Sequence, residues 1–572
     1  MPAATDARTE PAAETIERAY ANDAVAAGNP VWIHRVERAT ALAHARDAER
    51  RRRCGARLPL AGLPFAVKDN IDVAGLPTTA GCAAYSYMPK RSAAAVQKLL
   101  DAGAVCVGKT NLDQFATGLA GVRSPYGACR NAFHPDYISG GSSSGSALAV
   151  AYGLAEFALG TDTAGSGRVP AAFNNLVGLK PTRGLVSTAG VVPACRSLDC
   201  VSVFARSAHR AWQVLDAIKG FDEDDPYSRC DAPVSLGGRG ARLRVAVPSA
   251  LEFYGDAGYE RLFAQALERL GGAHVPIDFA PFLAVQKLLY DGPWVSERTA
   301  QLEEFLGSHG GDMHPVTRQV IAAGSRFSAI DTFRAQYRLA ALRRETESVW
   351  GDADVLVVPG APTIYRRAEV EADPIALNAR LGLYTNFVNL LDLAAITVPA
   401  GFRADGLPFG ITLIGPAFSD RALASIAAGF LGEAPLAVPA STVRVAVVGA
   451  HLSGMALNPQ LTERGARLVR SARTSAAYRL YDLADGRPGL VRGAEGEGAG
   501  IEVEVWEMGT AGFGSFVAQI PPPLGIGTLA LEDGEQVKGF LCEAHAVAGR
   551  RDITSFGGWR RYLDSDHSRR TA

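Results

Sequence analysis

The chain has 572 residues, and its 58 lysines and arginines against 59 aspartates and glutamates give a formal net charge of −1. This length exceeds what one hydrophobic core usually serves, so we expect two domains. The even charge balance provides no field for binding nucleic acid or an anionic membrane, and no apolar run is long enough to cross a bilayer, so neither class of partner is expected.

The first predicted elements are two helices, rich in alanine, glutamate and arginine, between Glu14 and Arg53. From Leu58 onward, short apolar runs alternate with amphipathic segments such as Ser92–Leu100 and Thr332–Val349. The apolar runs are Leu63–Val67, Val105–Val107, Phe157–Leu159, Leu243–Val247, Val355–Val358, Ala395–Val398 and Ile411–Ile414. This alternation predicts an α/β domain with a buried sheet covered by helices.

The pattern changes after Gly432. Residues 433–442 are rich in proline and alanine, which is typical of a linker between domains. Strand-like runs then alternate with turns, and long helical patterns are few. These runs are Val443–Val448, Ala476–Leu483, Ile501–Trp506, Thr528–Leu531 and Gly539–Cys542. We predict a first domain over residues 1–432, a linker over 433–442 and a smaller, β-rich α+β domain over 443–572.

Gly103–Thr110 matches the phosphate-binding pattern G-x-x-x-x-G-K-T letter for letter. Such a site needs a strand, then a loop of exposed backbone N–H groups, then a helix. Here a helix ends near Asp101, Gly103 suits its C-terminal cap, and Ala104–Val107 is itself strand-like. We expect no phosphate site, and a nucleotide-binding protein is the alternative from a different functional class.

Gly140–Ser146 is a run of glycines and serines, followed by an alanine-rich helix from about Ala147. Within it, Gly141–Gly145 matches the G-x-S-x-G elbow of some hydrolases, which needs a preceding hydrophobic strand and later Asp and His partners. The preceding Asp136–Gly140 is short and polar, and no later histidine has an obvious triad context, so the elbow is a minor alternative. A flexible linker is not expected, because well-patterned apolar segments flank the run. The run indicates tightly packed backbone, with hydroxyls as its functional groups.

A second run of small residues, Gly160–Ser166, follows the predicted strand Phe157–Leu159. We expect its N–H groups to converge on one point, as an oxyanion hole requires; they belong to Thr163, Ala164, Gly165 and Ser166. Ser166 is the predicted nucleophile, and it needs a base. No histidine is near it in the sequence. The candidate is Lys68, which ends an apolar strand where burial would lower its pKa.

These residues resemble the amidase signature enzymes, which are Ser–Ser–Lys hydrolases of amides. The resemblance covers roughly Ala12 to Leu431. Its landmarks are Lys68–Asn70, Asn111–Gly118, Ser124–Asn131, the Gly/Ser run and Val177–Thr182. In that family a serine held by a cis peptide precedes the nucleophile by 24 residues, and here that position is Ser142. The resemblance implies an amidase signature fold, with a mixed β-sheet core covered by helices, and a triad of Lys68, Ser142 and Ser166.

Four further positions carry predictions: three beside the nucleophile and one in the loop before Ser124. Gly167 stands where the family usually has a bulky aliphatic residue, which suggests room beside the nucleophile or a backbone contact with a small polar substrate. Asp162 and Arg168 flank the site, and we expect a buried structural pair. The resemblance also implies a substrate contact for Gly121, although an ordinary turn glycine explains it more simply.

Tyr290–Arg298 predicts a corner between two helices, with Tyr290 at the end of the first and Arg298 on the second. Spacing alone favours ordinary packing for Tyr290 and a solvated position for Arg298, with Trp294 as its stacking partner. However, this segment and Gly165–Arg168 resemble the allophanate hydrolases, a group within the family. The resemblance implies that Tyr290 and Arg298 hold a carboxylated urea, since a guanidinium fork suits a planar carboxylate.

The C-terminal domain resembles the γ-glutamyl cyclotransferase-like domain appended to those enzymes. The match lies in Val448–Gly454 and Phe516–Gly527. In that group the domain is associated with decarboxylation of N-carboxycarbamate, the first product. His451 is the candidate for stabilising charge or donating a proton there, and a buried, hydrogen-bonded histidine is the alternative.

Composition and resemblance together predict a cytoplasmic amidohydrolase, and the resemblance implies that it releases ammonia from allophanate. No metal or organic cofactor is expected, because eight scattered cysteines and ten histidines show no ligand spacing. The resemblance implies a urea carboxylase as the pathway neighbour, and a homodimer is among the expected assemblies. Another amidase, including the transamidation subunit that acts on charged tRNA, remains open.

Overall fold

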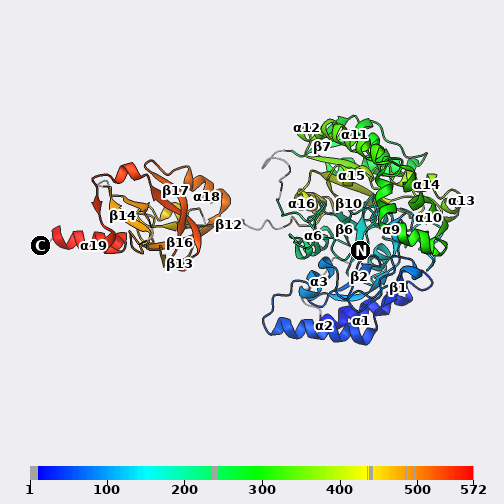
Figure 1. Ribbon diagram of the computed structural model, residues 1–572, viewed down its shortest axis with the longest axis horizontal. Coiled ribbons are helices and arrows are strands. Elements are labelled where there is room, and N and C mark those ends of the chain that lie inside the picture. The colour runs from blue at the N-terminus through cyan, green and yellow to red at the C-terminus, as the bar shows by residue number, and fades with distance from the viewer. Residues whose placement is uncertain are drawn as a thin grey trace. The chain divides into compact units, whose positions relative to one another are not determined.

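The computed structural model describes residues 11–570, apart from residues 233, 235, 237–241, 435, 437–441, 465, 484–485 and 495. The chain divides into two compact units (Figure 1): unit 1 ends at Leu436 and unit 2 begins at Ala437. Within the predicted linker 433–442, residues 435 and 437–441 lie outside the described residues. The bounds 1–432, 433–442 and 443–572 therefore remain a proposal.

Unit 1 is built on a mixed sheet that has eleven strands within the described residues. In sheet order the strands are β1 (Trp32–Arg35), β3 (Val105–Thr110), β2 (Pro64–Lys68), β4 (Phe157–Asp162), β6 (Cys200–Ala205), β5 (Val177–Lys180), β10 (Ala394–Phe402), β11 (Pro408–Gly415), β9 (Val355–Pro359), β7 (Arg244–Pro248) and β8 (Ala273–Ile277). β2 runs parallel to both β3 and β4, whereas β4 to β9 pair antiparallel through β6, β5, β10 and β11. The predicted mixed α/β sheet is confirmed.

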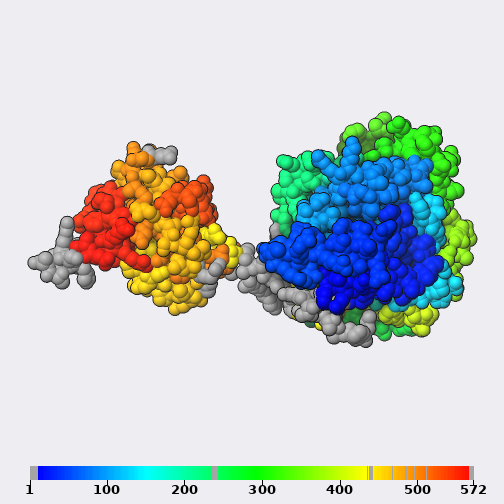
Figure 2. Space-filling model, turned by 90° about the horizontal axis from the view of Figure 1, so that it is seen from below, coloured from blue at the N-terminus to red at the C-terminus, as the bar shows by residue number. Residues whose placement is uncertain are grey.

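Helices cover this sheet, which explains why its central strands are continuous apolar runs. They are α1 (Ala12–Ala21), α2 (Arg38–Arg53), α3 (Ala94–Asp101), α4 (Ser144–Ala151), α5 (Val169–Phe173), α6 (Ala208–Ile218), α7 (Ala257–Leu270), α8 (Ala280–Tyr290), α9 (Trp294–His309), α10 (Pro315–Ala322), α11 (Ala329–Glu347), α12 (Val349–Asp352), α13 (Arg367–Ala372), α14 (Ala376–Leu381), α15 (Phe387–Leu390) and α16 (Asp420–Phe430). Figure 1 shows the sheet running from β1, near α1 and α2, to β7, near α11 and α12. In Figure 2 the N-terminal residues, in blue, form much of one face of unit 1.

The parallel strands β3, β2 and β4 place their carboxyl ends at one edge of the sheet. Lys68 ends β2 and Asp162 ends β4, and the loop that carries Ser166 follows at once. All five residues of β2 are buried, so its terminal lysine is held inside the core rather than in solvent. The fold therefore brings together the predicted base and the predicted nucleophile from segments about a hundred residues apart.

Unit 2 contains a five-stranded and a three-stranded sheet within the described residues, and the predicted β-rich texture is confirmed. The larger sheet has the order β13 (Arg467–Arg473), β16 (Glu502–Gly509), β12 (Thr442–Val447), β18 (Gln536–Cys542) and β17 (Leu524–Ala530). The smaller one has the order β15 (Pro488–Arg492), β14 (Tyr478–Asp482) and β19 (Arg551–Asp552). Its helices are α17 (Pro459–Thr462), α18 (Thr510–Val517) and α19 (Trp559–Arg570).

Candidate active site

Lys68 is a fully buried amine at the end of β2. Its Nζ donates to Ser142 Oγ and to Thr161 Oγ1, both at 2.7 Å. Burial lowers the pKa of Lys68 to about 7, because desolvation disfavours the charged form, while nearby carboxylates act in the opposite direction. A lysine in this state exchanges a proton with a neighbouring hydroxyl near neutral pH.

Ser142 lies in the loop that precedes α4, and the Gly141–Ser142 peptide bond is cis. Its hydroxyl accepts from Lys68, and its carbonyl accepts from the Asp113 N–H at 3.1 Å. The helix begins at Ser144 rather than near Ala147, so the second half of the Gly/Ser run is helical. Ser142 is thus fixed by contacts on both its side chain and its backbone.

The hydrolase-elbow interpretation of the same run is wrong. Its central serine would be Ser143, which is fully buried. The Ser143 hydroxyl donates to the Thr161 carbonyl at 3.2 Å, so it is bonded to strand β4 instead of facing a substrate.

Ser166 lies in the short loop between β4 and α5, and 3% of its surface is exposed. Within the described residues its hydroxyl makes no hydrogen bond, so the contact with Ser142 that a proton relay needs is not formed in this conformation. Gly165 precedes it at φ +139°, a conformation that favours glycine, and a Cβ there would lie 2.4 Å from Thr385 Oγ1. The loop can take this path only because residue 165 has no side chain.

Two of the loop's N–H groups are held by one carboxylate. Asp162 accepts from the Gly165 N–H at 2.9 Å and from the Gly167 N–H at 3.0 Å. The Gly165 N–H therefore already has a partner, which corrects its assignment to the oxyanion hole. The N–H groups of Thr163, Ala164 and Ser166 have no protein acceptor within the described residues, and they remain the candidates.

Asp162 and Arg168 form the predicted buried pair, and both side chains are fully buried. Two guanidinium nitrogens donate to the two carboxylate oxygens at 2.8 and 2.9 Å, and this contact lowers the pKa of Asp162 despite its burial. Arg168 also donates to the Thr385 carbonyl at 3.0 Å. The pair shapes the Ser166 loop and leaves no free charge in it.

The expected room beside Gly167 is absent. A Cβ at this position would lie 2.5 Å from the Cβ of Ser202, which belongs to the neighbouring strand β6. Glycine is therefore needed at residue 167 for close packing against β6. The sequence around Gly167 suggested space because the strand that fills it, β6, comes from a later part of the chain.

Two buried carboxylates at the site were not predicted. Asp113 accepts from the N–H groups of Gly121 and Arg123 at 2.9 and 2.8 Å. Asp199 accepts from Thr163 Oγ1 and from the Ala194 N–H at 2.8 Å. Asp113 stands in the Asn111–Gly118 landmark, whereas Asp199 is the last residue of the β5–β6 loop and has no motif around it. Both residues are recognised in the structure by the same feature: a buried carboxylate that accepts hydrogen bonds from the N–H groups of a loop.

Gly121 occupies a tight turn, which is the simpler of its two interpretations. Its φ is +79°, its N–H donates to Asp113, and its carbonyl accepts from the Cys129 N–H at 3.1 Å. A Cβ would lie 2.6 Å from the Gly140 carbonyl oxygen. With its N–H already bonded, the predicted substrate contact of Gly121 is not supported.

Tyr290 and Arg298 come together at the predicted helix corner, where α8 ends and α9 begins. Arg298 is 2% exposed, which overturns a solvated position. Its Nη2 donates to Tyr290 Oη at 3.3 Å and its Nη1 donates to Thr117 Oγ1 at 2.8 Å. The guanidinium lies 5.5 Å from the centre of the Tyr290 ring, so the stacking partner is Tyr290 rather than Trp294. Within the described residues no carboxylate lies within ion-pair distance of Arg298, although the charges of Asp199 and Glu297 act on it from farther away. Its guanidinium is therefore a candidate to bind an anion.

The comparisons with known proteins agree with this geometry. The Amidase family matches residues 15–424, which is more than half of the chain, and the family described as Allophanate hydrolase C-terminal domain matches residues 443–564. The chain belongs to the amidase family. The predicted resemblance is confirmed, and the second match assigns unit 2 to a domain type found with such amidases.

Several relatives of this amidase are similar over most of its length. Urea amidolyase of Lachancea kluyveri is 43% identical over 575 residues, which cover 94% of this chain and 31% of that protein. A glutamyl-tRNA(Gln) amidotransferase subunit of Haloarcula marismortui is 36% identical over 64% of this chain and 93% of its own length. The structure of Kluyveromyces lactis allophanate hydrolase shares 40% identity and a TM-score of 0.72, with 97% of both chains covered. This amidase spans about a third of the length of the urea amidolyases it matches.

The nucleotide-binding alternative is wrong. Gly103 ends the turn after α3, and Val105–Thr110 is strand β3 of the amidase sheet. The motif's Lys109 is fully buried and pairs with Asp69 at 3.1 Å. Its amine therefore belongs to a closed ion pair and is not available to a phosphate.

In unit 2, His451 is half-buried and its ring contacts two aromatic side chains. The ring centres of Phe516 and Phe540 both lie 5.1 Å away, and its Nε2 shares a hydrogen bond of 3.0 Å with Gln460 Oε1. Burial lowers the pKa of His451, so the imidazole is neutral near pH 7. These contacts are compatible with both predictions for His451: a packed, hydrogen-bonded histidine, and a neutral group that donates a hydrogen bond in catalysis.

Among the described residues, no helix is both long and apolar enough to cross a membrane. Within the same residues, no group of three or more metal-ligating side chains is placed to hold an ion.

Proposed function

We propose that this amidase hydrolyses allophanate, a carboxylated urea, and releases ammonia. The observation that carries the proposal is the fully buried Lys68 amine, bonded to Ser142 at 2.7 Å with its pKa lowered to about 7. An amine with this pKa is largely neutral slightly above pH 7 and can act as a general base. The match to an allophanate hydrolase structure over 97% of both chains supports the choice of substrate.

In the proposed reaction, Lys68 takes the proton of Ser142 while Ser142 takes the proton of Ser166. Ser166 Oγ then attacks the carbonyl of the terminal amide. The free N–H groups of Thr163, Ala164 and Ser166 stabilise the negative oxygen that develops. The proton returns through Ser142 to the leaving nitrogen, and ammonia departs. Water attacks the acyl-enzyme by the same relay and releases N-carboxycarbamate.

The other end of allophanate is a carboxylate, which we assign to Arg298 and Tyr290. Arg298 is buried without a carboxylate partner in the described part of unit 1, and its fork can meet both carboxylate oxygens. The Tyr290 hydroxyl, 3.3 Å from the guanidinium, orients it. A substrate held at this end presents its amide to Ser166 in one orientation, which favours reaction.

We extend the proposal to unit 2, which would remove carbon dioxide from N-carboxycarbamate, with His451 as the candidate group. The breakdown of carbamate then yields the second ammonia. The match of residues 443–564 supports a shared role for the two units. A urea carboxylase would supply the substrate, and a cytoplasmic location and a homodimer belong to the same proposal.

A transamidation subunit is the rival, because one such protein is 36% identical over 404 residues. The net charge of −1 and the presence of unit 2 argue against it. The test is the rate of ammonia release from allophanate, compared with biuret, malonamate and simple amides. We expect allophanate to be preferred by at least about a hundred-fold, as the loss of a buried charged contact would predict. Equal rates for allophanate and simple amides would overturn the substrate assignment.

A further inference from the structure

Asp199 is a buried carboxylate that the proposed reaction does not use. It is 6% exposed, and within the described residues no cation lies within ion-pair distance of it. It accepts from three donors: the hydroxyl of Thr163, the Ala194 N–H at 2.8 Å and the Cys195 N–H at 3.2 Å. Burial of a carboxylate without a cation beside it costs free energy of folding, and hydrogen bonds offset that cost. The three donors around Asp199 are therefore expected to be well ordered.

The Thr163 contact connects Asp199 to the candidate oxyanion hole. Thr163 lies between the end of β4 and Ser166, and its N–H is one of the three that have no acceptor within the described residues. A hydrogen bond from the Thr163 side chain to a fixed carboxylate restricts the position of the whole residue. The direction of the Thr163 N–H is therefore set in part by Asp199.

The loop that holds Asp199 is itself anchored to α9. Ser197 donates to both oxygens of Glu297, from its N–H and from its hydroxyl, each at 2.7 Å. Cys195 Sγ lies 3.6 Å from the Trp294 carbonyl oxygen. Glu297 directly precedes Arg298, so the loop spans from the Ser166 region to the helix that carries the proposed carboxylate-binding residue.

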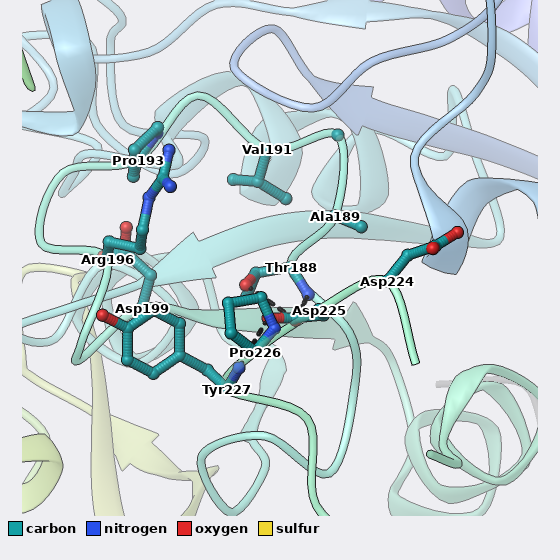
Figure 3. A pocket seen from close by; sticks show the side chains of 11 residues that line it. Thr188, Ala189, Val191, Pro193, Arg196, Asp199, Asp224, Asp225, Pro226 and Tyr227 are labelled. Carbon is teal, nitrogen blue, oxygen red and sulfur yellow. Dashed lines mark hydrogen bonds between the residues drawn. The ribbon is translucent and has the colours of Figure 1, made fainter. Parts of the chain in front are cut away.

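A cavity of about 160 Å³ adjoins this loop, and Asp199 lines its wall (Figure 3). Arg196 also lines the cavity, but Figure 3 shows its guanidinium turned toward Pro193. A second carboxylate of the same cavity, Asp225, has a similar set of donors. It accepts from Thr188 N–H at 2.6 Å, from Thr188 Oγ1 at 3.0 Å and from Tyr227 N–H at 2.9 Å. Asp225 contacts no residue of the proposed site and offers a matched control.

We propose that Asp199 is a positioning residue, which holds Thr163 so that its N–H points at the developing oxyanion. This inference rests on the proposed function. Asp199 is assigned no contact with the substrate and reaches the oxyanion hole through Thr163. Its charge also acts to raise the pKa of Lys68, so kcat is compared at a pH at which Lys68 is neutral in every variant. Because an oxyanion donor acts in the transition state, loss of this support lowers kcat and leaves KM nearly constant.

The test is a double-mutant cycle on ammonia release by the full chain. Thr163→Val removes the hydroxyl and keeps the N–H, and Asp199→Ala removes the acceptor. Each should lower kcat by about ten- to a hundred-fold, and the double variant should be no slower than the slower single variant. Thr163→Ser should recover most of the kcat lost in Thr163→Val. Asp225→Ala should lower the melting temperature without this loss of kcat.

Several results would overturn the inference. They are a wild-type kcat in Thr163→Val, multiplicative losses in the double variant, or equal losses of kcat in Asp225→Ala and Asp199→Ala. If Asp199→Ala does not fold, the comparison of Thr163→Val with Thr163→Ser decides alone. If Ser166→Ala loses activity but Thr163→Val keeps normal activity, only this inference is contradicted. If the wild-type chain does not release ammonia from any of the amides tested, the proposed function is contradicted as well.

Discussion

Two buried charged groups, Glu504 of unit 2 and Lys68 of unit 1, differ in how completely they are paired. In unit 2, Glu504 is 4% exposed and accepts from Ser453, Trp506 and Arg560 at 2.8 to 3.1 Å. These contacts lower the pKa of Glu504 despite its burial. In unit 1, the Lys68 amine is fully buried with two hydroxyls as its partners, and its pKa falls to about 7.

This difference separates structural charges from reactive ones. A charge that is fully paired stabilises the fold and has no reason to change its protonation. A lysine that is buried without an opposite charge beside it is poised to lose its proton, and such a costly arrangement marks a candidate functional site. By this criterion the chemistry of the chain is expected first at Lys68, and Glu504 serves to hold the loop next to His451.

Removal of the proposed nucleophile should have the largest effect. We expect Ser166→Ala to lower the rate of ammonia release by at least about ten-thousand-fold, because the covalent step is lost. The buried neighbour Ser143, whose hydroxyl is bonded to β4, is the matched position, and Ser143→Ala should retain far more activity. The assay is initial ammonia release at saturating allophanate. Comparable losses in both variants would show that packing, rather than nucleophilicity, explains the effect.

The next effect concerns two buried lysines on neighbouring strands. Lys68→Ala should lower the rate by about a thousand-fold, whereas Lys109→Met should mainly lower stability, because it leaves Asp69 buried without its partner.

In the wild type the rate of ammonia release should rise with pH through about 7, since only neutral Lys68 accepts a proton. Rate–pH profiles and melting temperatures of both variants test this. A Lys68→Ala enzyme with the wild-type profile would exclude Lys68 as the base.

A smaller effect is expected at the carboxylate end of the site. Arg298→Lys keeps the charge but loses the fork, so KM for allophanate should rise by about ten- to a hundred-fold. Turnover of an amide without a carboxylate should change less. Arg334→Lys, at an exposed position of α11, is the control. If both substrates lose the same activity, Arg298 has a structural role instead.

The smallest effect on ammonia release should come from unit 2. His451→Ala should leave allophanate consumption within about two-fold of wild type and slow bicarbonate formation by about a hundred-fold, the lower end of what a general acid or base contributes. His545→Ala, an exposed histidine of the same unit, is the control. Separate measurement of allophanate and bicarbonate decides this. Unchanged bicarbonate formation would identify His451 as a packed residue.

The fold was largely predictable from the sequence, because buried strands such as β2 and β9 are short apolar runs between amphipathic helices. The contact between Lys68 and Ser142 was also predictable, through spacing and family resemblance. Side-chain environments were not. Gly167 suggested space, but β6 fills it with Ser202, and Asp199 has no motif although it holds Thr163. Such contacts join segments distant in sequence, and composition or periodicity does not reveal them.

The most direct test of the central claim is to identify the serine that a serine-directed phosphonofluoridate labels in the full chain. Peptide mass mapping after labelling should place the adduct on Ser166, and excess allophanate should slow the labelling. Lys68→Ala should label far more slowly, because Ser166 would lack its base. An adduct on Ser142, Ser143 or a serine of unit 2, with Ser166 unmodified and ammonia release abolished, would contradict the account.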